Sequence, residues 1–267
     1  MDRGNGPSRR SFLKGVGIAT AACIAGGGAA MAQAGPARAR PLGVVRLALR
    51  AANPGSLREF YTKVLECPEL SAPEGGLAVR AGETEITFER ADKGEPFYHS
   101  AFNIPENMLA SAKRWLAART AILKRPDGRD EYHFAGWNAH AFYFLDPAGN
   151  ILEFIARHNL KNGREGEFSA RDILGVSEIG LVVGDVVKTV DAGRERLGLG
   201  VFAGARSDEL AAIGDDHRLL IVVKRGRVWN GGTKAARPAA VFPVRAEIAG
   251  TEGKLESAEG EFSVTGV

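Results

Sequence analysis

The sequence has little cysteine: Cys23 and Cys67 are the only two among 267 residues. We expect Cys23 to be removed with an N-terminal segment, which leaves Cys67 without an intramolecular partner. The fold therefore cannot depend on a disulfide, and zinc sites built on several cysteines and thiol redox centres are excluded. The sequence also lacks a Gly-x-Ser-x-Gly elbow, a phosphate-binding glycine loop and a His-Glu-x-x-His pair, so nothing supports a hydrolase.

An excess of one charge is also lacking once the N-terminal segment is set aside. The whole chain has 35 Lys and Arg against 32 Asp and Glu, but residues 1–34 hold four of the basic and one of the acidic residues, which leaves 31 of each sign. No basic stripe remains that would favour nucleic acid or a membrane surface as a partner. No later apolar run is long enough to span a bilayer, so we expect no stable membrane anchor.

The N-terminus carries an export motif. Residues 8–14 read Ser-Arg-Arg-Ser-Phe-Leu-Lys and precede a Gly/Ala-rich apolar run, which is a twin-arginine (Tat) pattern. Small-x-small sites predict cleavage after Ala32 or Ala34, so residues 1–34 are predicted to be a Tat signal peptide. The Tat translocase would then be a partner during export, and the mature chain would be periplasmic or secreted.

The rest of the chain is internally repeated. Leu65 and Leu197, like Arg46 and Glu178, occupy equivalent places in strand-helix-strand patterns at a fixed offset in sequence. We predict two units in a first domain (residues 43–158), a connector (159–173) and a second, incomplete domain (174–267). The last unit begins with a strand at 241–248 and does not finish, so we expect the second domain to be structural or to complete a surface or dimer contact.

Residues 142–154 place one carboxylate, Glu153, in an otherwise apolar strand. The segment Asp-Pro-Ala-Gly-Asn at 146–150 has the proline and glycine of a tight reversal, so residues 138–145 and 151–157 are predicted to form a hairpin. An acidic side chain on such a strand is exposed, paired or a ligand.

This hairpin resembles the closing strands of a βαβββ module in the vicinal oxygen chelate (VOC) superfamily, which includes glyoxalases, extradiol dioxygenases and fosfomycin- and bleomycin-resistance proteins. The resemblance implies an α+β fold in which tandem βαβββ modules form a curved, cup-like mixed sheet, here with an incomplete second copy. It also implies that Glu153 binds a divalent metal. His99 begins a segment (99–105) that is similar to the family's opening strand, where the first residue is commonly a metal-binding histidine.

The sequence departs from the family pattern at a third ligand. Arg46 stands where a histidine or glutamine ligand is usual, and a guanidinium cannot coordinate a metal. A further ligand would have to come from elsewhere, from Glu178 or another carboxylate, or from a partner chain. A homodimer is therefore an open alternative.

Strand parity predicts which side chains share the cup, because residues two apart on a strand face the same way. A hairpin register that pairs Glu153 with Tyr143 places that tyrosine in the cup. The predicted site consists of two metal ligands, His99 and Glu153, and of residues assigned to substrate binding or catalysis: Arg46, Arg50, Asn103 and Tyr143.

Two interpretations of this site stay open. In the first, His99 and Glu153 hold Fe²⁺, Mn²⁺ or Zn²⁺, an arginine binds an anionic substrate oxygen, and Tyr143 donates a hydrogen bond or acts as general acid. The chain would then be an extradiol dioxygenase-like or glyoxalase-like enzyme for a small oxygenated substrate. In the second, Arg46 pairs with Glu153 without any metal, and the chain is a small-molecule binding protein of the bleomycin-resistance type.

Overall fold

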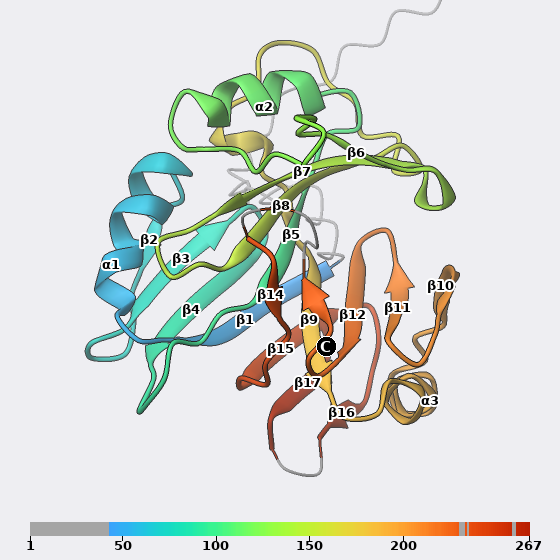
Figure 1. Ribbon diagram of the computed structural model, residues 1–267. Helices are drawn as coiled ribbons and strands as arrows, with labels where there is room; N and C mark the ends of the chain where they lie inside the picture. Colours follow the sequence, from blue (N-terminus) through green and yellow to red (C-terminus); the bar gives the residue numbers. More distant parts are fainter. Residues whose placement is uncertain (1–42, 230–232, 234, 258–259) are drawn as a thin grey trace, which may run out of the picture. The chain divides into compact units, whose positions relative to one another are not determined.

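The structure is a computed structural model that describes residues 43–229, 233, 235–257 and 260–267 (Figure 1). The predicted signal peptide (residues 1–34), with both cleavage sites, lies outside the described residues. Within the described ranges, no helix has the length and hydrophobicity that crossing a bilayer would require.

Four units follow one another along the chain (Figure 1). The first contains β1 (Gly43–Ala51), α1 (Pro54–Glu59), the π-helical η1 (Phe60–Val64), β2 (Glu69–Leu70), β3 (Leu77–Ala81) and β4 (Thr84–Arg90). The second contains β5 (His99–Ile104), α2 (Leu109–Ala117), β6 (Tyr132–Phe134), η2 (Ala135–Trp137), β7 (Ala139–Leu145) and β8 (Ile151–Arg157). After η3 (Ala170–Asp172), the third contains β9 (Gly175–Val183), α3 (Val186–Leu197), β10 (Val201–Arg206), β11 (Leu210–Asp215) and β12 (Arg218–Lys224). The short strands β13 (Val228–Trp229) and β14 (Arg237–Pro238) precede the fourth, which contains β15 (Val244–Ala249), β16 (Lys254–Glu256) and β17 (Phe262–Gly266).

Local sequence explains where these elements begin and end. Asp185 caps α3 by accepting a hydrogen bond from the Lys188 backbone N–H at 3.0 Å, and Gly198, at φ 67°, ends that helix. Between β7 and β8, one oxygen of Asp146 accepts the backbone N–H groups of Ala148 and Asn150, each at 3.0 Å, and closes the turn. The predicted hairpin is therefore confirmed.

The units pair differently from the predicted division at residue 158. An eight-stranded sheet, in the order β10-β11-β12-β9-β5-β8-β7-β6, combines the second and third units. A seven-stranded sheet, in the order β16-β17-β15-β1-β4-β3-β2, combines the first and fourth. In each full unit the opening strand pairs in parallel with the closing strand on one side. The other edge of each opening strand would be left unpaired within its own unit. The opening strand of another unit pairs with that edge, β9 with β5 and β15 with β1.

The fourth unit is more complete than the sequence suggested. Its opening strand is β15, and the unit predicted to remain unfinished continues with β16 and β17, with β17 parallel to β15. Among the described residues this unit has no helix. It is thus shortened, but its closing strand is present.

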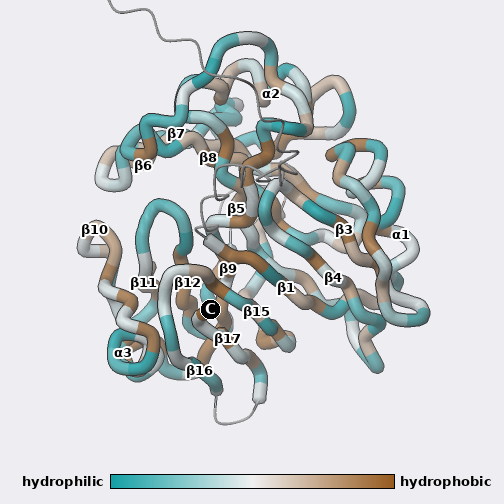
Figure 2. The backbone as a smooth tube through the Cα atoms, turned by 180° about the vertical axis from the view of Figure 1, so that it is seen from behind, coloured by the Kyte–Doolittle hydropathy of each residue, from teal (hydrophilic) through white to brown (hydrophobic). Residues whose placement is uncertain are grey.

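The helices pack against the sheets and bury an apolar core. Helix α1 contacts β3 and β4, α2 contacts β7 and β8, and α3 contacts β11, β12 and β16 (Figure 1). Hydrophobic residues recur along the central strands, among them β1 and β9, whereas the helices alternate between hydrophobic and hydrophilic residues (Figure 2). The two sheets meet where the Thr84 hydroxyl donates to the Val44 carbonyl at 2.6 Å and accepts the Val176 N–H at 2.8 Å. Gly175, at φ 143°, lies 3.0 Å from the same hydroxyl, measured from where a Cβ would stand, so a side chain there would be strained and crowded.

Candidate metal centre

Three buried side chains from three neighbouring strands converge in the eight-stranded sheet. His99 lies on β5, Glu153 on β8 and Glu178 on β9, and each offers one ligand atom within 4.8 Å of the other two. Their exposed fractions are 5%, 2% and 2%. We call these residues the triad.

The strand register explains this convergence. Ala101 pairs with Glu153 on one side of β5 and with Glu178 on the other. His99 lies two residues before Ala101 and therefore faces the same way. A histidine on the central strand is thereby flanked by carboxylates on both neighbouring strands.

Hydrogen bonding fixes the tautomer of His99. Its Nδ1 lies 3.0 Å from the Ile151 carbonyl oxygen, which can only accept, so Nδ1 carries the proton. In the neutral imidazole, Nε2 then presents a lone pair, and it lies 3.7 Å from a carboxylate oxygen of Glu153 and 3.7 Å from one of Glu178. Three acceptor atoms facing one another in a buried space need a cation between them, either a proton or a metal ion.

The two carboxylates differ in acidity. Burial, and then the charge of Glu178, raise the pKa of Glu153 well above its usual value, against a hydrogen bond from Tyr143 and the charge of Arg157. Burial also disfavours the ionised form of Glu178, but the charge of Arg157 outweighs it and lowers the pKa of that carboxyl. Of the two carboxyls, Glu153 is therefore the one that takes up a proton more readily.

Tyr143 stands beside Glu153 at the predicted register. Burial, followed by the charges of Glu153 and Glu178, raises the pKa of its hydroxyl well above 10. The hydroxyl therefore stays protonated and acts as a donor toward Glu153.

Arg157 supplies a buried positive charge next to the triad. Its side chain is fully buried, and its Nη2 makes a short ion pair with Glu178. Its Nε donates to the Asn103 side-chain oxygen at 3.1 Å, and its Nη1 lies 3.7 Å from an Asp216 carboxylate oxygen. Asn103 in turn donates to the Asp216 backbone carbonyl at 2.9 Å.

One side of the site is apolar. Ala101, two residues after His99, pairs with Glu153, and Gly180, two residues after Glu178, pairs with Ile221 on β12. Ile221 therefore occupies the position on β12 that Glu153 occupies on β8. Trp229 covers the site, with its ring centroid 5.2 Å from that of His99. A Cβ on Gly180 would stand 3.2 Å from the Trp229 ring and 3.4 Å from the His99 Cβ, so the close approach of this indole depends on a glycine.

The donor set fits a divalent transition metal. One imidazole nitrogen and two carboxylate oxygens suit Fe²⁺, Mn²⁺ or Zn²⁺. Three protein ligands leave positions open for external oxygens, as catalytic sites require. His99 Nδ1 donates to the Ile151 carbonyl, and Glu178 pairs with Arg157. Two of the three candidate ligands are thus oriented by outer partners, as metal ligands commonly are.

Of the predicted site, the structure brings together His99, Glu153, Tyr143 and Asn103, all on one face of the eight-stranded sheet. It does not bring the two arginines to them. Arg46 lies in the seven-stranded sheet, pairs with Glu247 at 2.6 Å and with Glu85 at 3.5 Å, and is 64% exposed at its side chain.

Arg50 lies in the same sheet as Arg46 and pairs with Glu89 at 3.3 Å. The expected six-residue cavity is therefore corrected, because β1 pairs with β15 rather than with the strands that carry the triad. The carboxylate partners of Arg46 are Glu85 and Glu247, and not Glu153 as the metal-free alternative assumed.

Glu178 brings a triad carboxylate from the third unit, so the second half of the chain contributes to the candidate site. The repeat offset that matches it to Arg46, at the position of a missing ligand, was the signal that pointed to it. Arg157 was only the last residue of a predicted strand, and nothing in its local sequence indicates burial.

His133 on β6, His140 on β7 and His158 directly after β8 form a group that is separate from the triad. The His133 and His140 rings stack with centroids 4.3 Å apart, and His140 Nδ1 lies 2.9 Å from His158 Nε2. Burial, followed by the nearby His133 and His158, lowers the pKa of His140. In the alternation along β7, His140 occupies the face opposite to Tyr143.

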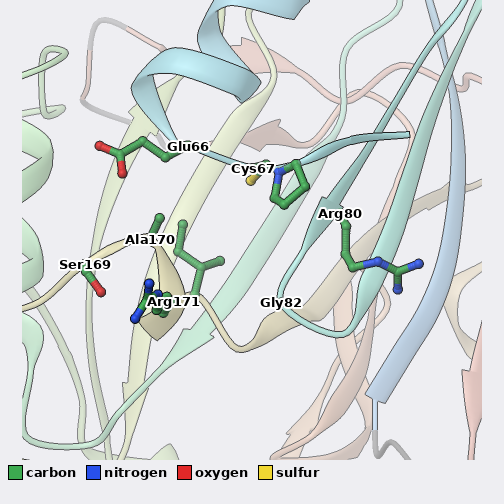
Figure 3. Close-up of a pocket in the computed structure, with 9 residues that line it drawn as sticks. Glu66, Cys67, Arg80, Gly82, Ser169, Ala170 and Arg171 are labelled. Carbon is green, nitrogen blue, oxygen red and sulfur yellow. The ribbon is translucent and has the colours of Figure 1, made fainter. Parts of the chain in front are cut away.

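Two hollows of several hundred Å³ lie elsewhere in the structure, and neither is lined by a triad residue. One, of about 610 Å³, is lined by residues that include Cys67, Arg80 and Ser169 (Figure 3). Another, of about 800 Å³, is lined by residues that include Arg46 and Glu247. Burial raises the pKa of the Cys67 thiol to about 12, so it stays protonated and unreactive.

Comparisons with known proteins bear on the fold. No protein-family model matches the sequence, and no curated protein matches it significantly. Among solved structures, a candidate dioxygenase from Bacillus subtilis is 15% identical with a TM-score of 0.55, and the match covers 85% of each chain. Glyoxalase I from Zea mays is 14% identical with a TM-score of 0.46 over 77% of this chain and 74% of that one. Lactoylglutathione lyase from Agrobacterium tumefaciens is 19% identical with a TM-score of 0.33 over 43% of this chain and 93% of that one. With its repeated units and curved mixed sheets, the chain has the α+β fold of the vicinal oxygen chelate superfamily.

Proposed function

We propose that this chain is an exported, metal-dependent enzyme that acts on a small substrate through two neighbouring oxygens. The observation that carries the proposal is the triad: three buried acceptor atoms within 4.8 Å of one another, in a set that suits Fe²⁺, Mn²⁺ or Zn²⁺. A divalent ion would supply Lewis acidity toward the substrate oxygens. The predicted Tat signal supports export in the folded state.

The side chains around the triad have separable roles. His99 is held in the ligand tautomer by the Ile151 carbonyl. Tyr143 keeps its proton and can donate it, or a hydrogen bond, to a group that gains negative charge. Ile221 and Trp229 supply an apolar wall that excludes water and strengthens electrostatic interactions at the site.

Two reaction classes fit this arrangement, and both are proposed by analogy of fold. An extradiol dioxygenase-like reaction consumes O₂ and requires a redox-active metal. A glyoxalase-like isomerisation needs neither. Oxygen uptake with catechols, compared with turnover of 2-oxoaldehyde adducts under anaerobic conditions, separates the two classes.

Elemental analysis of the mature protein, purified without chelators or an affinity metal column, tests the metal proposal. We expect near-stoichiometric Fe, Mn or Zn in the wild type and its loss in His99→Ala, Glu153→Ala and Glu178→Ala. His140→Ala, on the opposite face of β7, is the matched control and should keep its metal. A metal-free wild type that stays folded and gains no stability from added Fe²⁺, Mn²⁺ or Zn²⁺ would overturn the enzyme proposal.

A metal-free binding protein is the second candidate. The observation that favours it is charge satisfaction within the site: Arg157 pairs with Glu178, and Glu153 can hold a proton. This candidate predicts that the metal-free protein binds small molecules and that added divalent ions do not change their affinity. A homodimer remains a prediction, to be tested by the mass of the protein in solution.

A further inference from the structure

Arg157 is the charged group that a three-ligand metal site does not need. It lies on β8 four residues after Glu153 and so faces the same side of the sheet. Its guanidinium carbon lies 5.8 Å from the ring centroids of both Trp137 and Phe202, and none of the side chain is exposed. A buried arginine keeps its charge because its pKa lies far above any physiological pH.

Glu178 stands between this charge and the metal position. One of its oxygens contacts Arg157, and the other faces His99 Nε2 at 3.7 Å. An ion held by that second oxygen would be separated from the guanidinium by one carboxylate group. Within a buried site, a unit charge that close acts strongly on anything bound there.

The charges around the site do not cancel once a divalent ion is present. Glu153 and Glu178 balance the ion, and Arg157 adds one positive charge. Asp216 offsets this charge only in part, because it lies on the Nη1 side of the guanidinium, away from Glu178, and its side chain is 18% exposed.

We propose that Arg157 is a specificity-determining residue, which makes the loaded centre positively charged and so selects substrates that bind through an anionic oxygen. This inference rests on the proposed metal-dependent function and adds the charge of the substrate to it. A neutral ligand of the metal gains nothing from Arg157. An anionic ligand gains the Coulomb attraction of the guanidinium.

Titration of Co²⁺-loaded protein with two small probes, followed by visible absorption, tests this proposal. Acetohydroxamate binds metals as an anion through two oxygens, and imidazole binds as a neutral ligand. We expect Arg157→Met to weaken acetohydroxamate by about tenfold or more, with imidazole affinity unchanged, and Arg157→Lys to recover most of the loss. Arg46→Met, which removes an arginine of the other sheet, is the matched control and should change neither affinity.

A second variant keeps the test decisive if Arg157→Met does not fold. Asp216→Asn removes the charge on the Nη1 side of the guanidinium and should strengthen acetohydroxamate several-fold without affecting imidazole. Equal effects on both probes, or no effect on either, in the variants that fold would overturn the role of Arg157. Failure of the wild type to bind Co²⁺ would instead overturn the metal-dependent function, so the two failures are distinguishable.

Discussion

Replacing Glu153 by glutamine distinguishes two effects of the buried carboxylates: the stability lost through their charge repulsion, and the stability gained when they bind a metal. Glutamine keeps the shape of the side chain and removes its charge. The pKa of Glu153 is raised in the folded protein, mainly by burial and by Glu178. A raised carboxyl pKa means that stability is fully present below the unfolded-state pKa and is lost as pH rises through the folded-state pKa. The metal-free wild type should therefore lose stability with rising pH, and Glu153→Gln should not lose this contribution.

The size of the effect follows from the geometry. The ligand atoms of Glu153 and Glu178 lie within 4.8 Å of each other. Two like charges at that separation repel by about 3 kcal/mol at an effective dielectric constant near 20. For a domain of this size, that corresponds to a difference of about 6–12 °C in Tm once Glu153 is ionised.

Thermal unfolding between pH 5 and 9, in EDTA and in excess Mn²⁺, measures both sides of this prediction. In EDTA, the Tm of Glu153→Gln should exceed that of the wild type by a margin that grows with pH, while Glu74→Gln, at an exposed position, follows the wild type. In Mn²⁺ at about 1,000 times its Kd the order should reverse, because binding then adds about 4.1 kcal/mol to the protein that binds the ion, which exceeds the repulsion. Parallel pH curves in EDTA, or equal gains from Mn²⁺ in both proteins, would refute the reasoning.

Three further predictions concern the hairpin turn, the aromatic cover and export. Burial raises the pKa of Asp146 from 3.8 to about 6. Its contribution to stability is therefore present at acid pH and lost as pH rises through about 6. In a Glu153→Gln background, Asp146→Asn should remove up to about 3 kcal/mol of this pH dependence of the unfolding free energy, measured with urea. Gly180→Ala should displace Trp229, destabilise the fold by about 1–3 kcal/mol and change tryptophan fluorescence, whereas an unshifted emission spectrum would contradict the packing described. Replacing Arg9 and Arg10 with lysine should retain the precursor in the cytoplasm, as cell fractionation would show, and unimpaired export would argue against the Tat signal.

The parts of the fold that the sequence predicted well are those that local chemistry determines. The β7–β8 hairpin follows from proline, glycine and aspartate in one short turn, and its Tyr143–Glu153 pairing follows from the turn length. Helix α3 is bounded by local chemistry in the same way, by an aspartate cap and a terminal glycine. In each case the deciding contacts join residues a few positions apart.

The pairing of units was not predictable in this way. Each opening strand has an apolar pattern that suits any other opening strand, so nothing in β1 alone specifies β15 rather than β5 as its neighbour. The assumption that consecutive units pair placed Arg46 and Arg50 beside His99. It also left Glu178, in the third unit, as only one of several possible sources of a further ligand.

The repeat shows how the two sheets differ where, within the described residues, only the eight-stranded sheet carries a candidate metal centre. Arg46 and Glu178 occupy equivalent positions on β1 and β9. On β9 the residue is a buried acid whose partner Arg157 comes from a neighbouring unit, and it faces His99. On β1 it is an arginine whose partners, Glu85 and Glu247, leave it in solvent. A carboxylate can exchange its proton for a metal ion, whereas an arginine cannot. The other two triad positions differ as well, because the pairing places Arg245 at the position of His99 and Thr265 at that of Glu153. The seven-stranded sheet therefore lacks a ligand at each equivalent position.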